Sequence, residues 1–137
     1  MNRIQPHEFA KFLRAYRFIG GAIRGVKVRH KGRETSVEFR LSVRESITDL
    51  GTEARRVRLR IVLEGASEYR FQMRPDQPKV RITDARLGYH NGLFYLTFDS
   101  VGLGAGETAQ VFDFRASEVF AAGRELLWEE VKSERGA

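Results

Sequence analysis

A strict alternation of apolar and polar residues constrains this chain more than any other feature of its sequence. The stretch RRVRLR alternates arginines with aliphatic residues, in the order Arg56, Val57, Arg58, Leu59 and Arg60. Because successive side chains of a β-strand point to opposite faces, one face of this strand is basic and the other is apolar. The pattern predicts an antiparallel sheet with one face on a core and the other in solvent.

The same period of two recurs in the neighbouring segments. The predicted inward residues of two strands are Val37, Phe39, Leu41 and Val43, followed by Val57, Leu59, Ile61 and Leu63. An earlier strand carries Val26 and Val28 inward, and Ile23 falls out of phase with them, which predicts a bulge near Gly25. The polar stretch HKGRET joins the strand with Val26 and Val28 to the strand that begins near Val37, and it is typical of a hairpin connection.

Further strands are predicted after residue 65. In SEYRFQMR, Tyr69, Phe71 and Met73 share one face, and Pro75 and Pro78 then interrupt the chain. The stretch KVRITDARLGYHNGLFYLTFDS contains His90-Asn91-Gly92 between two apolar runs, and Asn-Gly suits the positive φ angles of a type I′ hairpin turn. The stretch AQVFDFR is predicted as another strand. The end of the chain fits either a capped turn from Ser117 to Gly123 before a last strand with Leu126 and Trp128, or one helix, and Gly123 favours the first.

One segment has a helical period instead. Apolar residues at positions 9, 12, 13 and 16 fall on one stripe, which predicts an amphipathic helix over about 6–18. Pro6 suits its first turn, and Gly20-Gly21 is predicted to end it. With large apolar side chains on this stripe, we expect the helix to pack on the sheet.

These elements predict a mainly β fold, an antiparallel sheet curled into a sandwich or a partly open barrel, with the N-terminal helix packed on it. We expect a single domain over 1–137, with a β-rich body over about 22–131 and a frayed tail over 132–137. The predicted core consists of Phe39, Leu59, Ile61, Phe71, Phe94, Leu96, Phe98 and Phe112, with Phe9, Phe12, Leu13 and Tyr16 of the helix.

Composition excludes several functional classes. The chain contains no cysteine, which removes disulfides and cysteine nucleophiles and favours the cytoplasm. Its first residues, MNRIQPHEFAKFLRAYRF, have no uninterrupted apolar run of the kind found in secretory signals. No segment has the ~20 apolar residues of a membrane-spanning helix, so we expect no membrane association.

The residues that carry chemistry are few and scattered. His7, His30 and His90 lack metal-site spacing, so no metal is predicted. The stretch GLGAG lacks the third glycine and the helix of a dinucleotide fingerprint, which makes it a loop and predicts no cofactor. Three carboxylates lie on or beside predicted strands, namely Asp84, Asp99 and Asp113, but their spacing does not make them converge. We therefore expect a protein that is not an enzyme.

The remaining candidate for a functional surface is a basic face of the predicted sheet. Residues 1 to 60 carry 15 Lys and Arg against 6 Asp and Glu, whereas residues 61 to 137 carry 9 against 12. An acidic protein partner would be attracted to such a face, and so would the phosphates of a nucleic acid. The candidate partner-binding residues are Lys27, Arg29, Lys31, Arg40, Arg44, Arg56, Arg58 and Arg60.

Three observations keep other interpretations open. Phe39, the aromatic residue of these segments, points inward, which disfavours the base stacking of sheet proteins that bind single-stranded nucleic acids. Glu38 and the acidic second half, including Glu64, Glu68, Glu129 and Glu130, offer solvated ion pairs to the arginines. Arginine makes up 19 of the 24 basic residues, which also fits a GC-rich genome. Homo-oligomerisation stays open as well.

The succession RFIGGAIRGVKV, a hairpin, RLRIVLEGASEYRF, RITDARLGYHNGLFYLTFD and FDFRASEVF resembles a group of small β-rich bacterial domains. Some of these are classed as immunity proteins of polymorphic toxin systems. The resemblance covers roughly residues 18 to 120, as a rhythm of strands without a catalytic motif. It implies a protein that neutralises a toxin by covering it with a surface, and it assigns no site residue.

Overall fold

The computed structural model describes residues 1–46, 54–72, 80–100, 102–104 and 106–131. Eight strands, two α-helices and a 3₁₀ turn occur in the described residues. In chain order the elements are β1 (Asn2–Arg3), η1 (Pro6–Glu8), α1 (Phe9–Ala15), β2 (Tyr16–Lys31), β3 (Glu34–Glu45), β4 (Arg56–Phe71), β5 (Val80–Arg81), β6 (Arg86–His90), β7 (Leu93–Thr97), α2 (Val111–Arg115) and β8 (Val119–Val131).

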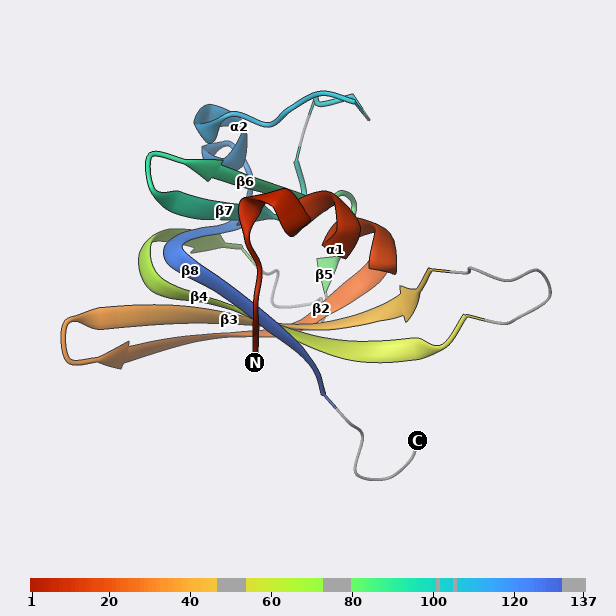
Figure 1. Cartoon of the computed structure of the whole chain (residues 1–137), viewed down its shortest axis with the longest axis horizontal. Coiled ribbons are helices and arrows are strands. Elements are labelled where there is room, and N and C mark those ends of the chain that lie inside the picture. The colour runs from red at the N-terminus through yellow and green to blue at the C-terminus, as the bar shows by residue number, and fades with distance from the viewer. Residues whose placement is uncertain (47–53, 73–79, 101, 105, 132–137) are drawn as a thin grey trace.

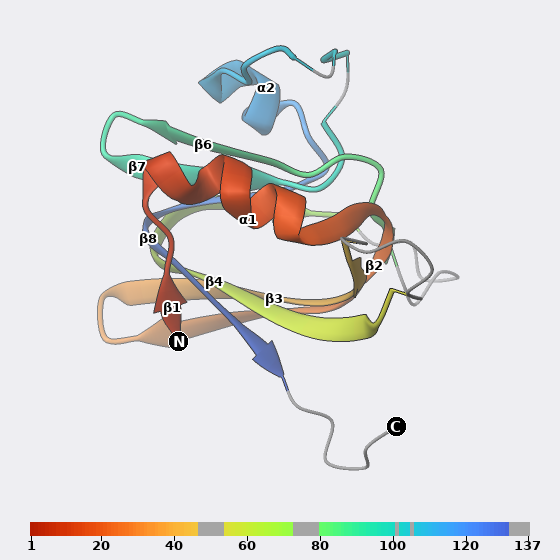
Figure 2. The same ribbon diagram turned by 45° about the vertical axis from the view of Figure 1, so that its right-hand side comes forward.

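Seven of the strands form a curled antiparallel sheet. They follow one another in the order β5-β2-β3-β4-β8-β7-β6, and β1 pairs with β8 beside this path. Figures 1 and 2 show the sheet bent into a half-barrel, with the β6–β7 hairpin facing β2, β3 and β4 across the interior. Of the two architectures that the sequence predicts, the structure is therefore the partly open barrel.

The core fills the concave side of the sheet. All eight inward residues predicted for β3 and β4 are buried, from Val37 to Val43 and from Val57 to Leu63. Phe94, Leu96 and Phe98 are also buried, as predicted, whereas Phe71 is only half-buried. The predicted bulge in β2 is confirmed, because its register with β3 shifts between Ile23 and Gly25. The period of two thus identified the part of the core that β3, β4 and β7 supply, whereas the buried residues Ile4, Phe18 and Ile82 were not predicted.

Helix α1 lies across the interior, between the β6–β7 hairpin and β2 (Figure 2). Phe12 is buried in an aromatic cluster, with its ring centroid 5.6 Å from that of Phe18 and 5.1 Å from that of Trp128. The predicted packing on the sheet is confirmed, but the predicted end of the helix is wrong. The backbone becomes extended at Tyr16, and the carbonyl of Ala15 accepts a hydrogen bond from the backbone N–H of Ser46 (3.1 Å) rather than from the next turn of a helix.

Gly20 and Gly21 lie inside β2 and do not end a helix. Here the register of β2 with β3 shifts between Arg17 and Ala22. Gly20 has a φ of 90°, and a Cβ on Gly21 would lie 2.8 Å from the backbone oxygen of Ser42. The glycine pair therefore allows a bulge where two strands approach closely.

A second, smaller core lies on the other side of β7 and the start of β8. It contains the buried residues Tyr95, Ala109, Phe114, Phe120 and Ala122. Helix α2 covers this cluster on the side of the β6–β7 hairpin away from α1 (Figure 1). The prediction of a strand over AQVFDFR is wrong, and so is the predicted burial of Phe112, which is 71% exposed.

The hairpin turn is confirmed, because Asn91 and Gly92 have φ angles of 53° and 80° between β6 and β7. The predicted last strand with Leu126 and Trp128 is confirmed, but the predicted turn from Ser117 to Gly123 is wrong beyond Glu118, and so is the alternative of one helix. One continuous strand, β8, begins at Val119 and runs through Gly123, where a Cβ would lie 2.8 Å from the backbone oxygen of Glu64. Close packing of β8 on β4, rather than a helix cap, explains this glycine.

Some predictions fall outside the described residues, namely those on Met73, Pro75, Pro78 and the tail 132–137. No helix among the described residues is long and apolar enough to cross a membrane.

Candidate functional site

The candidate site is the outer face of β2, β3 and β4, which points away from the main core. In the antiparallel register Arg40 lies opposite Arg60, and Arg44 lies opposite Arg56. Strand β2 is the other neighbour of β3, and its Lys27 lies opposite Glu38. Because directly opposed residues point to the same side of a sheet, the sequence-predicted basic residues share one face. They are Lys27, Arg29, Lys31, Arg40, Arg44, Arg56, Arg58 and Arg60, and we call this surface the basic face.

The basic face is hollowed in two places. A hollow of about 640 Å³ is lined by five arginines and two glutamates, Arg24, Arg29, Arg40, Arg58, Arg60, Glu38 and Glu129. A second one, of about 260 Å³, lies at the other end of the same strands and includes Arg17, Arg44 and Arg56. Both hollows have an excess of positive charge, which suits the carboxylates or phosphates of a partner.

A buried carboxylate sits at the centre of this face. Glu38 points outward from β3, yet it is only 3% exposed, because two arginine side chains cover it. The Nε of Arg40 donates to one of its oxygens (2.8 Å) and the Nε of Arg60 donates to the other (2.5 Å). Arg60 also donates to Glu129 of β8 (2.8 Å). The interpretation that Glu38 forms an ion pair with the arginines is confirmed, but the pair is not solvated, because the side chains of Arg40 and Arg60 cover the carboxylate.

The charges of this cluster hold each other in the ionised form. Burial by itself raises the pKa of Glu38, but the hydrogen bonds from Arg40 and Arg60 outweigh it and lower the pKa below its ordinary value. The hydrogen bond with Glu38 in turn raises the pKa of Arg60. Arg40, Arg60 and the two glutamates therefore neutralise one another in the middle of the face.

The other basic residues of the face keep their charge uncompensated within the described part of the chain. Arg56 donates to the hydroxyl of Ser42 (3.2 Å) and Arg44 donates to the carbonyl of Ala54 (3.3 Å), and both acceptors are neutral. Arg58 is exposed and lies between Ser42 of β3 and Val131 of β8. Among the described residues no carboxylate lies within ion-pair distance of Lys27, Arg29, Lys31, Arg44, Arg56 or Arg58.

Of the acidic residues that the sequence offered as ion-pair partners from the second half, most do not pair with the basic face. Glu129 does reach the face, through Arg60, as the ion-pair interpretation expected. Glu68 pairs with Arg115 of α2, and Glu130 pairs with Arg55. Glu64 forms no ion pair with another described residue. The acidic half of the sequence thus compensates only a small part of the basic face.

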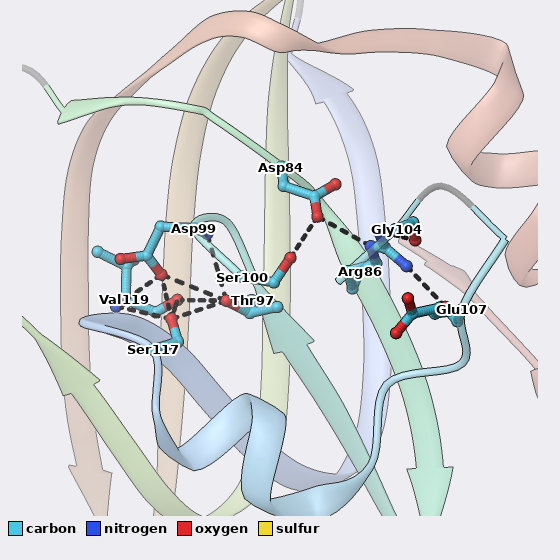
Figure 3. Close-up of polar contacts among 9 residues, drawn as sticks. All are labelled: Asp84, Arg86, Thr97, Asp99, Ser100, Gly104, Glu107, Ser117 and Val119. Atoms are coloured by element: carbon cyan, nitrogen blue, oxygen red, sulfur yellow. Dashed lines mark hydrogen bonds and ion pairs between the residues drawn. The ribbon is translucent and has the colours of Figure 1, made fainter. Parts of the chain in front are cut away.

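A second polar cluster, which sequence reasoning missed, holds the start of β8 (Figure 3). Asp99 accepts hydrogen bonds from the backbone N–H groups of Glu118 and Val119, each at 3.2 Å. The buried hydroxyl of Ser117 also donates to Asp99, and Thr97 donates to Ser117 (2.7 Å). Asp99 accepts these hydrogen bonds from groups of the protein itself, which indicates that it has a structural role.

The same figure shows how the glycine-rich loop is attached. Asp84 accepts hydrogen bonds from the hydroxyl of Ser100 and from the Nε of Arg86 (2.9 Å). The other nitrogens of Arg86 donate to the carbonyls of Glu107 (2.7 Å) and Gly104 (2.9 Å). Arg86 therefore attaches the predicted GLGAG loop to β6 through hydrogen bonds to two backbone carbonyls.

Of the three carboxylates named from the sequence, Asp84 and Asp99 are neighbours in a parallel bridge, but each accepts hydrogen bonds from a different set of donors. Asp113 accepts from the backbone N–H of Gln110 (2.7 Å) at the start of α2, and a ring nitrogen of His90 lies 3.2 Å from the carbonyl oxygen of Ala109. No group of three His, Asp or Glu side chains with metal-site geometry occurs in the described part of the chain.

Comparison with known proteins finds no matching protein family, no matching curated protein and no matching solved structure.

Proposed function

We propose that this chain is a non-enzymatic binding protein whose basic face docks on the acidic surface of a partner protein. The observation that carries the proposal is the set of uncompensated cations around Arg58, aligned on three neighbouring strands. Charge complementarity over such a face speeds encounter and selects partners, and it does so most strongly at low salt. Arginine is also enriched at protein interfaces because its planar group binds carboxylates with two parallel hydrogen bonds.

The composition of the face supports a protein partner over a nucleic acid. The aromatic residues Tyr16, Phe18 and Phe39 of β2 and β3 are buried on the other side of the sheet, so they offer no stacking surface for bases. Val131, which lies beside Arg58, adds an apolar contact of the kind found at protein interfaces.

The role of an immunity protein, implied by the resemblance to bacterial toxin-neutralising domains, fits this mode of action. Such a protein acts by covering a partner surface and needs no catalytic group. The product of the gene adjacent to the one encoding this chain is the natural partner to test, and a toxin gene in that position supports this role. A solitary gene in a metabolic operon argues against it.

The proposal is tested by charge reversal at one exposed position. Polyglutamate serves as the acidic protein probe and duplex DNA as the nucleic-acid probe, both measured by fluorescence anisotropy at about 50 mM salt. Arg58→Glu should weaken polyglutamate binding at least about tenfold, or ~1.4 kcal/mol. The matched control is Arg14→Glu on α1, which is also exposed and changes the net charge equally.

Each outcome decides between the candidate functions. An equal loss in both variants shows attraction by net charge alone and contradicts a specific face. Tight, steeply salt-dependent binding of DNA without binding of polyglutamate supports the nucleic-acid alternative. Failure of the wild-type protein to bind either probe removes the basic face as a functional site.

A further inference from the structure

Strand β2 has a long edge beside the basic face that no strand in the described part of the chain covers beyond Ile23. Its other side is paired with β3 up to Lys31, but β5 pairs with it only at Ala22 and Ile23. Within the described part of the chain no strand pairs with residues 24–31 on this side. A strand edge of this kind directs the N–H and C=O groups of every second residue into solvent, where another strand can bind them.

Two stripes of side chains follow this edge. Lys27, Arg29 and Lys31 are exposed on the outer face of the sheet. Val26 and Val28 alternate with them on the inner face, where they are half-buried and pack against the main core. An added strand would therefore have cations next to its outward residues and aliphatic groups next to its inward residues.

We propose that the partner binds here by β-strand addition, through an extended segment in which acidic and apolar residues alternate. This inference rests on the proposed function and specifies how the acidic partner is held. Directly opposed side chains on neighbouring strands have Cβ atoms about 5 Å apart, which brings carboxylates of the added strand within reach of Lys27 and Arg29. Main-chain hydrogen bonds supply affinity and the alternating side chains supply selectivity.

The charges of the edge select against a second copy of this chain as the occupant. Two β2 edges paired with each other would place Lys and Arg side chains next to Lys and Arg side chains, and like charges on adjacent strands destabilise pairing. Basic side chains on an edge discourage self-association for this reason. An acidic segment avoids this repulsion between like charges. The edge therefore favours an acidic strand over a second copy of β2.

Three synthetic peptides separate strand addition from attraction by charge. The first alternates Glu with Val, the second has the same composition with its Glu residues grouped together, and the third is the first with the N–H groups of alternate residues methylated. Strand addition predicts that the alternating peptide binds at least about tenfold more tightly than the other two, a difference of ~1.4 kcal/mol. Equal binding of all three overturns strand addition and leaves the proposed function standing, whereas no binding of any of them contradicts both.

Variants and hydrogen exchange locate the binding. Lys27→Glu with Arg29→Glu should abolish binding of the alternating peptide, while Lys11→Glu with Arg14→Glu on α1, which makes the same change in net charge, should leave it within about twofold of wild type. Addition of the alternating peptide should slow hydrogen exchange at alternate amides between Gly25 and Lys31. The proposal is overturned if these edge amides are already fully protected from exchange in the free protein, or if they gain no protection with the peptide. The basic residues would then only prevent self-association at the edge.

Discussion

The outer surface of the sheet is built in two different ways. Over β7 and the start of β8, the side chains that point away from the main core are apolar, and α2 covers Tyr95 and Phe120 there. Over β2, β3 and β4 the corresponding side chains are mostly basic, and among the described residues no helix lies on them. Both regions follow the same period of two, so the residue type at alternate positions decides whether a face is covered.

The difference separates stability from binding within one sheet. Covering an apolar side chain with a helix removes it from water and stabilises the fold. Covering a guanidinium group costs free energy unless a hydrogen-bond acceptor replaces the water that the group loses. Glu38 is the exception on the basic face, because a carboxylate there supplies two arginines with acceptors. The covered region therefore stabilises the fold, and the uncovered region stays available to a partner.

Removing the anchor of α2 should have the largest effect on stability. Phe114 is fully buried and its ring centroid lies 5.3 Å from that of Tyr95, so Phe114→Ala should cost about 3 to 5 kcal/mol. Urea denaturation measures the free energy of unfolding. Phe112→Ala on the same helix is the matched control, and because Phe112 is mostly exposed it should change this free energy by less than about 0.5 kcal/mol. Comparable losses in the two variants would contradict the one-sided packing of α2.

These two phenylalanines also show where the sequence misleads. Phe112 and Phe114 alternate with polar residues as in a strand, and this pattern predicted a strand. A helix of five residues is too short to show a period of 3.6, so the alternation dominates. A local signal was present, since an acidic residue three positions after Gln110 can accept a hydrogen bond from its backbone N–H, as Asp113 does.

Other parts of the molecule were predictable because local pattern and tertiary structure agree. The inward residues of β3 and β4 and the turn at Asn91-Gly92 follow from alternation and turn chemistry alone. The alignment of the basic residues on one face was predicted for the same reason, whereas the pairing of Arg40 with Arg60 became visible only in the register of the strands. The burial of Glu38 was not predictable, because it depends on side chains of a second strand. The Asp99 cluster joins residues about twenty positions apart and has no local signature either.

Breaking the neutral centre of the basic face should have the next largest effect. Glu38→Gln removes an ionised acceptor from two arginines, and we expect a loss of about 2 kcal/mol at neutral pH. The pKa of Glu38 is lowered in the folded protein, so its contribution is present above its ordinary pKa of 4.5 and is lost as the pH falls through the lower, folded value.

The pH dependence provides the control for this variant. Urea denaturation of wild type and Glu38→Gln should show a constant difference above about pH 5 that shrinks toward pH 3. A difference that is independent of pH would show that the carboxylate acts by packing alone. A more stable variant would show that the desolvation of Glu38 outweighs its hydrogen bonds.

A tight contact in the covered region should respond to the addition of one methyl group. A Cβ on Gly88 of β6 would lie 2.9 Å from the ring of Phe114, closer than unbonded carbon atoms approach, so α2 must shift outward. Gly88→Ala should cost about 1 kcal/mol, at the low end for overpacking of a core. Thermal denaturation measures the loss, and the double variant Gly88→Ala with Phe114→Leu should lose less stability than the sum of the two single variants. An unchanged melting temperature would contradict the close packing of α2 on β6.

The smallest effect is expected in the uncovered region. Arg58 is exposed and has no carboxylate within ion-pair distance among the described residues, so Arg58→Glu should change the free energy of unfolding by less than about 0.5 kcal/mol. The neighbouring change Arg60→Glu should cost more, because it removes the hydrogen bonds to Glu38 and Glu129 and places a third carboxylate beside them. Urea denaturation of the two variants therefore separates arginines that are free to bind a partner from those that the fold already uses. A loss of several kcal/mol in Arg58→Glu would show that this arginine is paired in the folded protein and would remove it from the proposed binding face.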